Sequence, residues 1–236
     1  MVTNAFFLIQ GRDLVAKNAT NLAINLTDID YVVLSHGHYD HTGGLEYLDN
    51  KKVYACPDIF IPKYIRTNDQ YKYVGIPYSR EYYEKENKIE FIDVQSSMKL
   101  TERISLHVNF KKQEPNDFYL KIDNNYTSDV FNDELVLSLN TNNGLIIVSG
   151  CSHSGIINII EKVIGDDRTK NIYAFLGGFH LANLSQEKVK IIAEKISHYH
   201  INMIGISHCT GNKLAGYLNG SRVFDFNVGD CFNIPF

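Results

Sequence analysis

The chain has 236 residues, of which 44% are hydrophobic and 21% are charged, a balance typical of folded globular proteins and not of disordered ones. Its 23 basic and 27 acidic side chains give a formal net charge of −4, which argues against a protein that mainly coats nucleic acid. No apolar run approaches the roughly 20 residues that a membrane-spanning helix needs. The four cysteines lie far apart and form no CxxC pair, so we expect reduced thiols and a cytoplasmic location.

Short apolar runs alternate with helical periodicity along the chain. The predicted strands cover 31–34, 52–55, 89–94, 135–139, 145–148, 172–176, 203–206 and 223–226, each a short β-rich run. The predicted helices run from Ser154 to about Gly165, from Ser185 to Ile196, and over 212–218, the first two opening on an N-capping serine. We therefore expect a single domain over 1–236, in the α/β class, with helices outside the sheets. The pattern alone leaves open whether there is one twisted sheet or two stacked sheets.

The segment 57–87 differs from its surroundings because it is rich in tyrosine. One interpretation is a helical excursion that packs on the surface. The other is a lid over a pocket, with the tyrosines as its walls. Four basic residues of this segment are interpreted as solvated surface charges, although they could also serve a phosphate group: Lys63, Arg66, Lys72 and Arg80.

Four potential metal ligands lie within six positions, directly after the predicted strand 31–34. They are His36, His38, Asp40 and His41. A strand end is rigid, and the loop that leaves it can turn several side chains toward one point. Imidazole nitrogen and carboxylate oxygen together suit zinc, and also iron or manganese. Histidines this dense would be costly to bury unless they bound something, so the motif predicts a metal site.

Three more histidines follow apolar strands in the same way: His153, His180 and His208. A zinc-type site draws its ligands from several strand ends, so we expect these histidines to converge with the first group on one pocket. The other three histidines are interpreted as ordinary residues of a strand and a helix end: His107, His198 and His200.

At this point the chain resembles the metallo-β-lactamase superfamily. The resemblance rests on four motifs, namely His36-Gly37-His38-Tyr39-Asp40-His41-Thr42-Gly43-Gly44, Gly150-Cys151-Ser152-His153, Gly177-Gly178-Phe179-His180 and Ser207-His208-Cys209-Thr210-Gly211. Within the superfamily they are similar to a subgroup often named 7,8-dihydropterin-6-yl-methyl-4-(β-D-ribofuranosyl)aminobenzene-5′-phosphate synthase, many of whose members are known only as metal-dependent hydrolases. The resemblance implies an αββα sandwich with two mixed β-sheets and helices on the outer faces.

The resemblance also implies a role for each ligand. His36, His38 and His153 would hold the first metal ion, and Asp40, His41 and His208 the second. His180 stands where many superfamily members have a bridging aspartate, so the second ion should bind more weakly. A further departure lies near the N-terminus, where the stretch Leu8-Ile9-Gln10-Gly11 replaces an Asp-Thr-Gly segment in a shortened chain. The missing aspartate would support a ligand from behind, and its loss should loosen that ligand.

These residues predict a hydrolase with two divalent ions, most simply zinc. A metal ion in a partly open site lowers the pKa of its bound water to about 7, and the resulting hydroxide, oriented by Asp40, would attack an ester, phosphoester or lactone. Cys209 is interpreted as a buried bystander thiol near the metals or a weak substrate contact. Thr210 and Gly211 would open the short helix after His208 and hold an anionic group of a small-molecule substrate.

Two other functions stay open on the same scaffold. The first is a mononuclear-iron redox enzyme similar to persulfide dioxygenases, which use only part of this ligand set. The second is a non-catalytic protein that binds a metal or a small ligand. The sequence predicts neither the substrate nor the oligomeric state.

Overall fold

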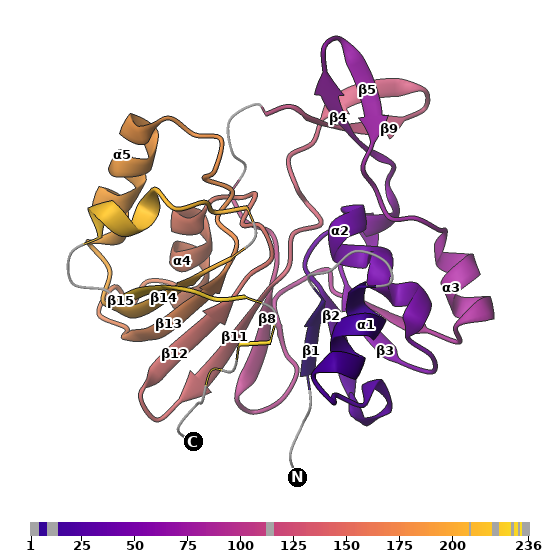
Figure 1. Ribbon diagram of the computed structural model, residues 1–236, viewed down its shortest axis with the longest axis horizontal. Helices are drawn as coiled ribbons and strands as arrows, with labels where there is room; N and C mark the ends of the chain where they lie inside the picture. The colour runs from indigo at the N-terminus through magenta and orange to yellow at the C-terminus, as the bar shows by residue number, and fades with distance from the viewer. Residues whose placement is uncertain are drawn as a thin grey trace. The chain divides into compact units, whose positions relative to one another are not determined.

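The chain folds into two units in the computed structural model, which describes residues 5–8, 14–111, 116–207, 209–218, 222–227, 229–230 and 232 (Figure 1). Unit 1 comprises Met1–Gln95 and Lys112–Leu135, and unit 2 comprises Ser96–Lys111 and Val136–Phe236. Each unit has its own sheets and its own hydrophobic core.

The main sheet of unit 1 is wholly parallel and has the strand order β1-β2-β3-β6. Its strands are β1 (Ala5–Leu8), β2 (Tyr31–Leu34), β3 (Lys52–Ala55) and β6 (Glu90–Asp93). Val32, Val33 and Leu34 are fully buried, as expected for a parallel strand that is covered on both faces. The carboxyl end of this buried strand leads directly into the His36 motif, which therefore starts from a fixed point.

Helices cover the main sheet of unit 1. They are α1 (Leu14–Asn21), η1 (Leu26–Asp28), α2 (Tyr39–Thr42), η2 (Gly43–Tyr47), η3 (Pro57–Phe60) and α3 (Arg80–Glu86), where η marks a 3₁₀ helix. Val15 of α1 and Tyr83 of α3 pack in one hydrophobic cluster with the strand residues Val32, Val53 and Phe91. Burial of these apolar side chains attaches the helices to the strands that position the predicted ligands.

A second, antiparallel sheet of unit 1 has the order β10-β9-β4-β5. It consists of β4 (Lys63–Thr67), β5 (Gln70–Tyr73), β9 (Phe118–Ile122) and β10 (Asn125–Ser128). The predicted helical excursion over 57–87 is therefore wrong for 63–73, where β4 and β5 form, whereas η3 and α3 of this segment are helical. Asn68 and Asp69 have φ angles of 49° and 61°, the two positive values that a tight hairpin turn requires. This Asn-Asp pair between alternating residues was the sequence signal for a hairpin.

Unit 2 contains a seven-stranded mixed sheet in the order β15-β14-β13-β12-β11-β8-β7. Its strands are β7 (Met98–Lys99), β8 (Ile104–His107), β11 (Val136–Thr141), β12 (Gly144–Val148), β13 (Ile172–Gly177), β14 (Ile201–Ile206) and β15 (Arg222–Asp225). Strands β12 to β15 are mutually parallel. Their carboxyl ends therefore lie at one edge of the sheet, where the loops with the predicted ligands begin.

The helices of unit 2 are α4 (Ile156–Ile164), α5 (Gln186–Ile196) and the 3₁₀ helix η4 (Leu214–Tyr217). They pack on one face of the sheet (Figure 1) through a large apolar cluster that includes Ile160, Phe175 and Val189. Ser185 caps α5 as predicted, because its hydroxyl accepts the N–H of Lys188. Ser154 does not cap α4. Gly155 takes that place with a φ angle of 87°, which glycine adopts without steric cost.

Among the described residues, no helix combines the length and the apolar character needed to cross a membrane.

Candidate metal centre

The loop after β2 holds three buried histidines. His36 and His41 are fully buried and His38 is 6% exposed. Gly37 lies between His36 and His38, and a side chain at this position would overlap the carbonyl oxygen of Ile59. The backbone therefore passes tightly against η3, and this close approach requires glycine.

The histidine rings of this loop face one another at ligating distance. Nε2 of His36 lies 3.1 Å from Nδ1 of His38. Zinc–nitrogen bonds of about 2.0–2.1 Å in tetrahedral geometry place two nitrogens roughly 3.3 Å apart, so this pair fits one divalent ion. The hydroxyl of Ser35 lies 3.0 Å from Nδ1 of His36 and 3.3 Å from Nδ1 of His41. A hydrogen bond at Nδ1 fixes the ring and directs Nε2 to the ligating role.

Asp40 and His41 form a second pair on the short helix α2. Their Oδ2 and Nε2 atoms are 3.6 Å apart, and the Asp40 side chain is 34% exposed whereas His41 is fully buried. A carboxylate that is partly open to solvent beside a buried imidazole suits a metal position with room for water. Unit 1 thus presents the two ligand pairs that the sequence resemblance assigned to two different ions. The assignment itself stays a prediction.

A buried ion-pair network that we did not predict supports this loop. The Lys63 ammonium donates hydrogen bonds of 2.7 Å to Asp129 and 3.0 Å to Asp133. Asp133 also accepts the backbone N–H of Gly37 at 2.7 Å, between the two ligands His36 and His38. Because a carboxylate that accepts a ligand-loop N–H restrains that loop, Asp133 is a positioning residue for the histidine pair.

The burial of Lys63 corrects the prediction that it is a solvated surface charge. The side chain is 1% exposed, and so are Asp129 and Asp133. Burial acts to lower the pKa of Lys63, but the carboxylates of Asp133 and Asp129 outweigh it and the pKa is raised. Burial raises the pKa of Asp133 against the opposing attraction of Lys63. The pairing keeps Lys63 charged in a place where a lone ammonium would lose its proton.

Aromatic rings form one wall around His38. Its ring centroid lies 4.9 Å from that of Phe118 on β9 and 5.7 Å from that of Phe131. The backbone N–H of Tyr39 also donates to the carbonyl of Val74 at 2.9 Å, so the small sheet is joined to the ligand loop. Apolar walls exclude water from a metal ligand and lower the local dielectric constant.

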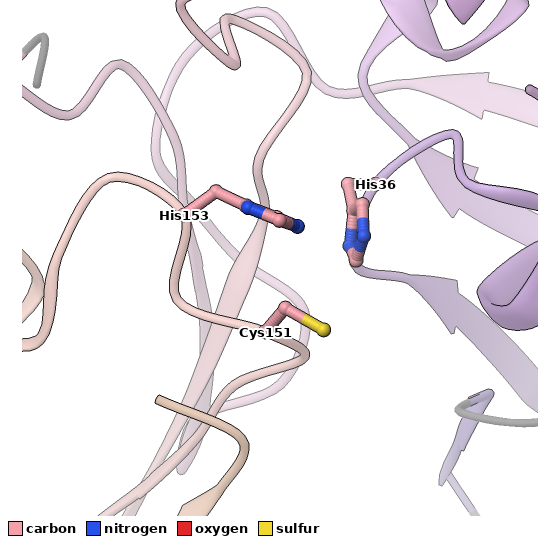
Figure 2. A group of neighbouring side chains, drawn as sticks. All are labelled: His36, Cys151 and His153. Carbon is pink, nitrogen blue, oxygen red and sulfur yellow. The ribbon is translucent and has the colours of Figure 1, made fainter. Parts of the chain in front are cut away.

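The ligands of unit 2 come from the loops after two neighbouring parallel strands. Cys151 and His153 follow β12 and are 3% and 7% exposed, and His180 follows β13. The rings of His153 and His180 have centroids 4.5 Å apart. Figure 2 shows Cys151 and His153 on the loop of unit 2, and His36 on the loop that leaves β2 in unit 1.

Three further predictions concerned His208, the N-terminal stretch and Thr210. His208 and the stretch 9–13 lie outside the described residues. The prediction that Thr210 opens the short helix is wrong. Helix η4 starts at Leu214, with Lys213 as its N-cap. Instead the Thr210 hydroxyl accepts the N–H of Phe179 at 3.0 Å and donates to the carbonyl of Ser207 at 2.9 Å. Its role is to join two ligand loops of unit 2.

Cys209 is half-buried, and its sulfur lies beside Cys151 and His180. A hydrogen bond from Cys151 lowers the pKa of the Cys209 thiol to about 5, with the His180 side chain and backbone N–H acting in the same direction against burial. Thiolate character makes a cysteine both a nucleophile and a metal ligand. The interpretation of Cys209 as a bystander thiol or a weak substrate contact stays a prediction.

Comparison with known proteins agrees with this geometry. The family model of the metallo-β-lactamase superfamily matches residues 7–55, the part of the chain that contains the His36 motif. A Methanocaldococcus jannaschii protein named 7,8-dihydropterin-6-methyl-4-(β-D-ribofuranosyl)-aminobenzene-5′-phosphate synthase is 30% identical over 211 residues, which are 83% of this chain and 71% of the relative. The chain belongs to the metallo-β-lactamase superfamily.

Two other proteins match most of the chain. An uncharacterized protein of the same organism is 34% identical over 213 residues, which cover 87% of this chain and 78% of the relative. The crystal structure of Tm1679, described as a metal-dependent hydrolase of the β-lactamase superfamily, has a TM-score of 0.84 at 27% identity and covers 97% of this chain and 88% of that one. The predicted resemblance and α/β fold class are confirmed. The small antiparallel sheet of unit 1, β10-β9-β4-β5, was not predicted.

Proposed function

We propose that the protein is a metal-dependent hydrolase that cleaves an ester or phosphoester bond of a small molecule in the cytoplasm. The proposal rests on one observation, namely that the loop and short helix after β2 present two pairs of potential metal ligands. His36 and His38 are buried with facing nitrogens 3.1 Å apart, and Asp40 and His41 lie beside them at 3.6 Å. The solved relative described as a metal-dependent hydrolase supports the proposal.

Each unit supplies part of the proposed ligand set. Unit 1 offers His36, His38, Asp40 and His41, and unit 2 offers His153, His180 and His208. The nitrogen and oxygen donors fit zinc, iron or manganese, and we propose two divalent ions of this class. That ligands of both units bind the same ions is the prediction made from the sequence.

In the proposed reaction the bound ion and the side chains of the chain have different roles. A divalent ion in such a site acts as a Lewis acid and lowers the pKa of water to about 7. Asp40, which is partly exposed, orients the attacking water and accepts its proton. Ser35 and Asp133 hold the histidine loop in place, and Phe118 and Phe131 keep bulk water away from His38.

A second candidate reaction comes from the relative named as a synthase. That name favours a transfer in which a second small molecule, and not water, accepts the cleaved group. The same ligands and the same Asp40 would serve it, because activation of an oxygen or nitrogen nucleophile needs the same proton acceptor.

Elemental analysis and a substrate screen test the proposal together. We expect the purified protein to contain one to two equivalents of zinc, iron or manganese and to hydrolyse bis-p-nitrophenyl phosphate or p-nitrophenyl esters. His38→Ala should lose metal and activity because it removes one nitrogen of the facing pair, whereas His198→Ala should change neither. Folded protein without metal, recovered from metal-replete cells, would contradict the proposal. Metal-loaded protein that acts only when a second substrate is present would favour the transfer reaction.

A further inference from the structure

Two cysteines and one histidine meet at the sheet edge of unit 2. Cys151 follows β12, His180 follows β13 and Cys209 follows β14. The three strands are adjacent and parallel, so their carboxyl-terminal loops lie side by side. The ligand atoms of the three residues all lie within 4.8 Å of one another.

We infer that Cys151, His180 and Cys209 form a thiolate-containing site for a thiophilic divalent ion such as Zn²⁺, within unit 2. Metal–sulfur bonds of about 2.3 Å and metal–nitrogen bonds of about 2.0 Å in tetrahedral geometry place ligand atoms roughly 3.5–3.8 Å apart. The upper limit of 4.8 Å on the separations is about 1.0–1.3 Å above these values, a difference that side-chain rotation can remove. Two sulfurs and one imidazole leave a fourth position for water.

Backbone hydrogen bonds bring the three loops together. The N–H of Gly178 donates to the carbonyl of Gly150 at 2.8 Å, and the N–H of Ala182 donates to the carbonyl of Cys209 at 3.1 Å. The Cys209 sulfur accepts the backbone N–H of His180 at 3.2 Å. An N–H directed at sulfur stabilises a thiolate ligand.

Glycine at position 178 makes room for the sulfur of Cys209. A Cβ atom at this position would lie 2.8 Å from Sγ of Cys209 and 2.9 Å from the carbonyl oxygen of Gly150. His180 itself has a φ angle of 51°, a left-handed conformation that is rare for a residue with a side chain. Its loop therefore takes an unfavourable backbone geometry that directs His180 toward the two thiols.

The donor set decides which ion fits. Soft thiolate ligands select zinc and similar thiophilic ions over magnesium, calcium or manganese. Cys151 is 3% exposed, whereas Cys209 and His180 are half-buried. Neither cysteine is among the ligands of the hydrolase proposal, whereas His180 is named in both. The inference concerns which side chains bind an ion in unit 2, and it does not depend on the reaction.

Cobalt spectroscopy of the full chain tests the site. All other proposed ligands offer nitrogen or oxygen, so a near-ultraviolet sulfur-to-cobalt charge-transfer band arises only when a cysteine binds the ion. Metal-free protein with reduced thiols should develop this band on addition of Co²⁺, and Zn²⁺ should abolish it. Cys151→Ser and Cys209→Ser should each weaken the band, and the double variant should lose it.

Matched controls separate this site from the other features of the molecule. Cys56→Ser changes a buried thiol of unit 1 and should keep the band. His38→Ala should keep it as well, even when activity is lost, which separates this inference from the hydrolase proposal. Circular dichroism confirms that each variant is folded, and Cys209→Ala repeats the test should the serine variant unfold. Absence of the band in the reduced wild-type protein, its persistence in the double variant, or its loss in His38→Ala would overturn the inference.

Discussion

His107 on β8 is a half-buried histidine whose surroundings oppose its charged form. Its Nε2 lies 2.8 Å from the Ser138 hydroxyl, and no ligand role was predicted for it. Burial lowers the pKa of His107 to about 4, and the nearby charges of Lys162 and Lys170 add to the effect. The unfolded chain, with a histidine pKa of about 6.5, therefore binds this proton first as the pH falls.

His107 should therefore make the folded protein less stable as the pH falls. The folded-state pKa is below the unfolded value, so the stability is complete above about pH 6.5 and falls as the pH drops toward 4. We expect the free energy of unfolding of the metal-free wild type, measured in urea, to fall between pH 7 and pH 5. In His107→Gln this fall should be smaller by about 2 kcal/mol. His198→Gln, at an exposed position, should follow the wild type. Equal pH dependence in all three proteins would refute the assignment.

At the scale of elements, the ligand loop of unit 1 is held from three directions. Strand β2 anchors its start, η3 contacts Gly37, and the carboxylate of Asp133 accepts the Gly37 N–H at 2.7 Å. Lys63 on β4 ties Asp133 to Asp129, so the small antiparallel sheet contributes to the rigidity of the loop. A metal site needs such support because small displacements of a ligand weaken binding.

Removal of the Lys63 charge should therefore be costly. Lys63→Met leaves two carboxylates buried near one another with no cation, and loss of one partner of a buried ion pair costs roughly 3–5 kcal/mol. We expect a loss of this size in urea unfolding, together with weaker metal binding. Lys72→Met changes an exposed lysine on β5 of the same sheet and should shift stability by no more than about 0.5 kcal/mol. Similar effects in both variants would show that the network does not matter.

At the scale of the whole molecule, bound metal should stabilise the fold. An ion that binds the folded chain and not the unfolded one adds about 2.7 kcal/mol at a concentration 100 times its Kd, or roughly 5–10 °C in Tm for a chain of this size. We expect chelation to lower the Tm by this amount and added zinc to restore it. His38→Ala should show a smaller change, since it lacks one ligand. A Tm that is the same with and without chelator would argue against a metal bound by the native state.

Local sequence patterns determined the elements and the chemistry of the ligand loop. The runs 31–34 and 52–55 are β2 and β3 with the predicted bounds, because four-residue runs rich in valine and tyrosine are too short for a helix and have the composition of strands. The spacing of His36, His38, Asp40 and His41 already pointed to metal binding, since all four are neighbours in the chain.

Only the tertiary structure decided what supports those ligands. Lys63 contacts Asp129 and Asp133, which are 66 and 70 positions further along the chain, and no local pattern shows that a lone lysine will be buried between them. The same holds for Cys151, His180 and Cys209, whose meeting depends on the order and register of β12, β13 and β14. Local preferences act between neighbours in sequence, whereas sheet pairing brings distant side chains together, and it is this pairing that places charge and sulfur beside the histidines of each unit.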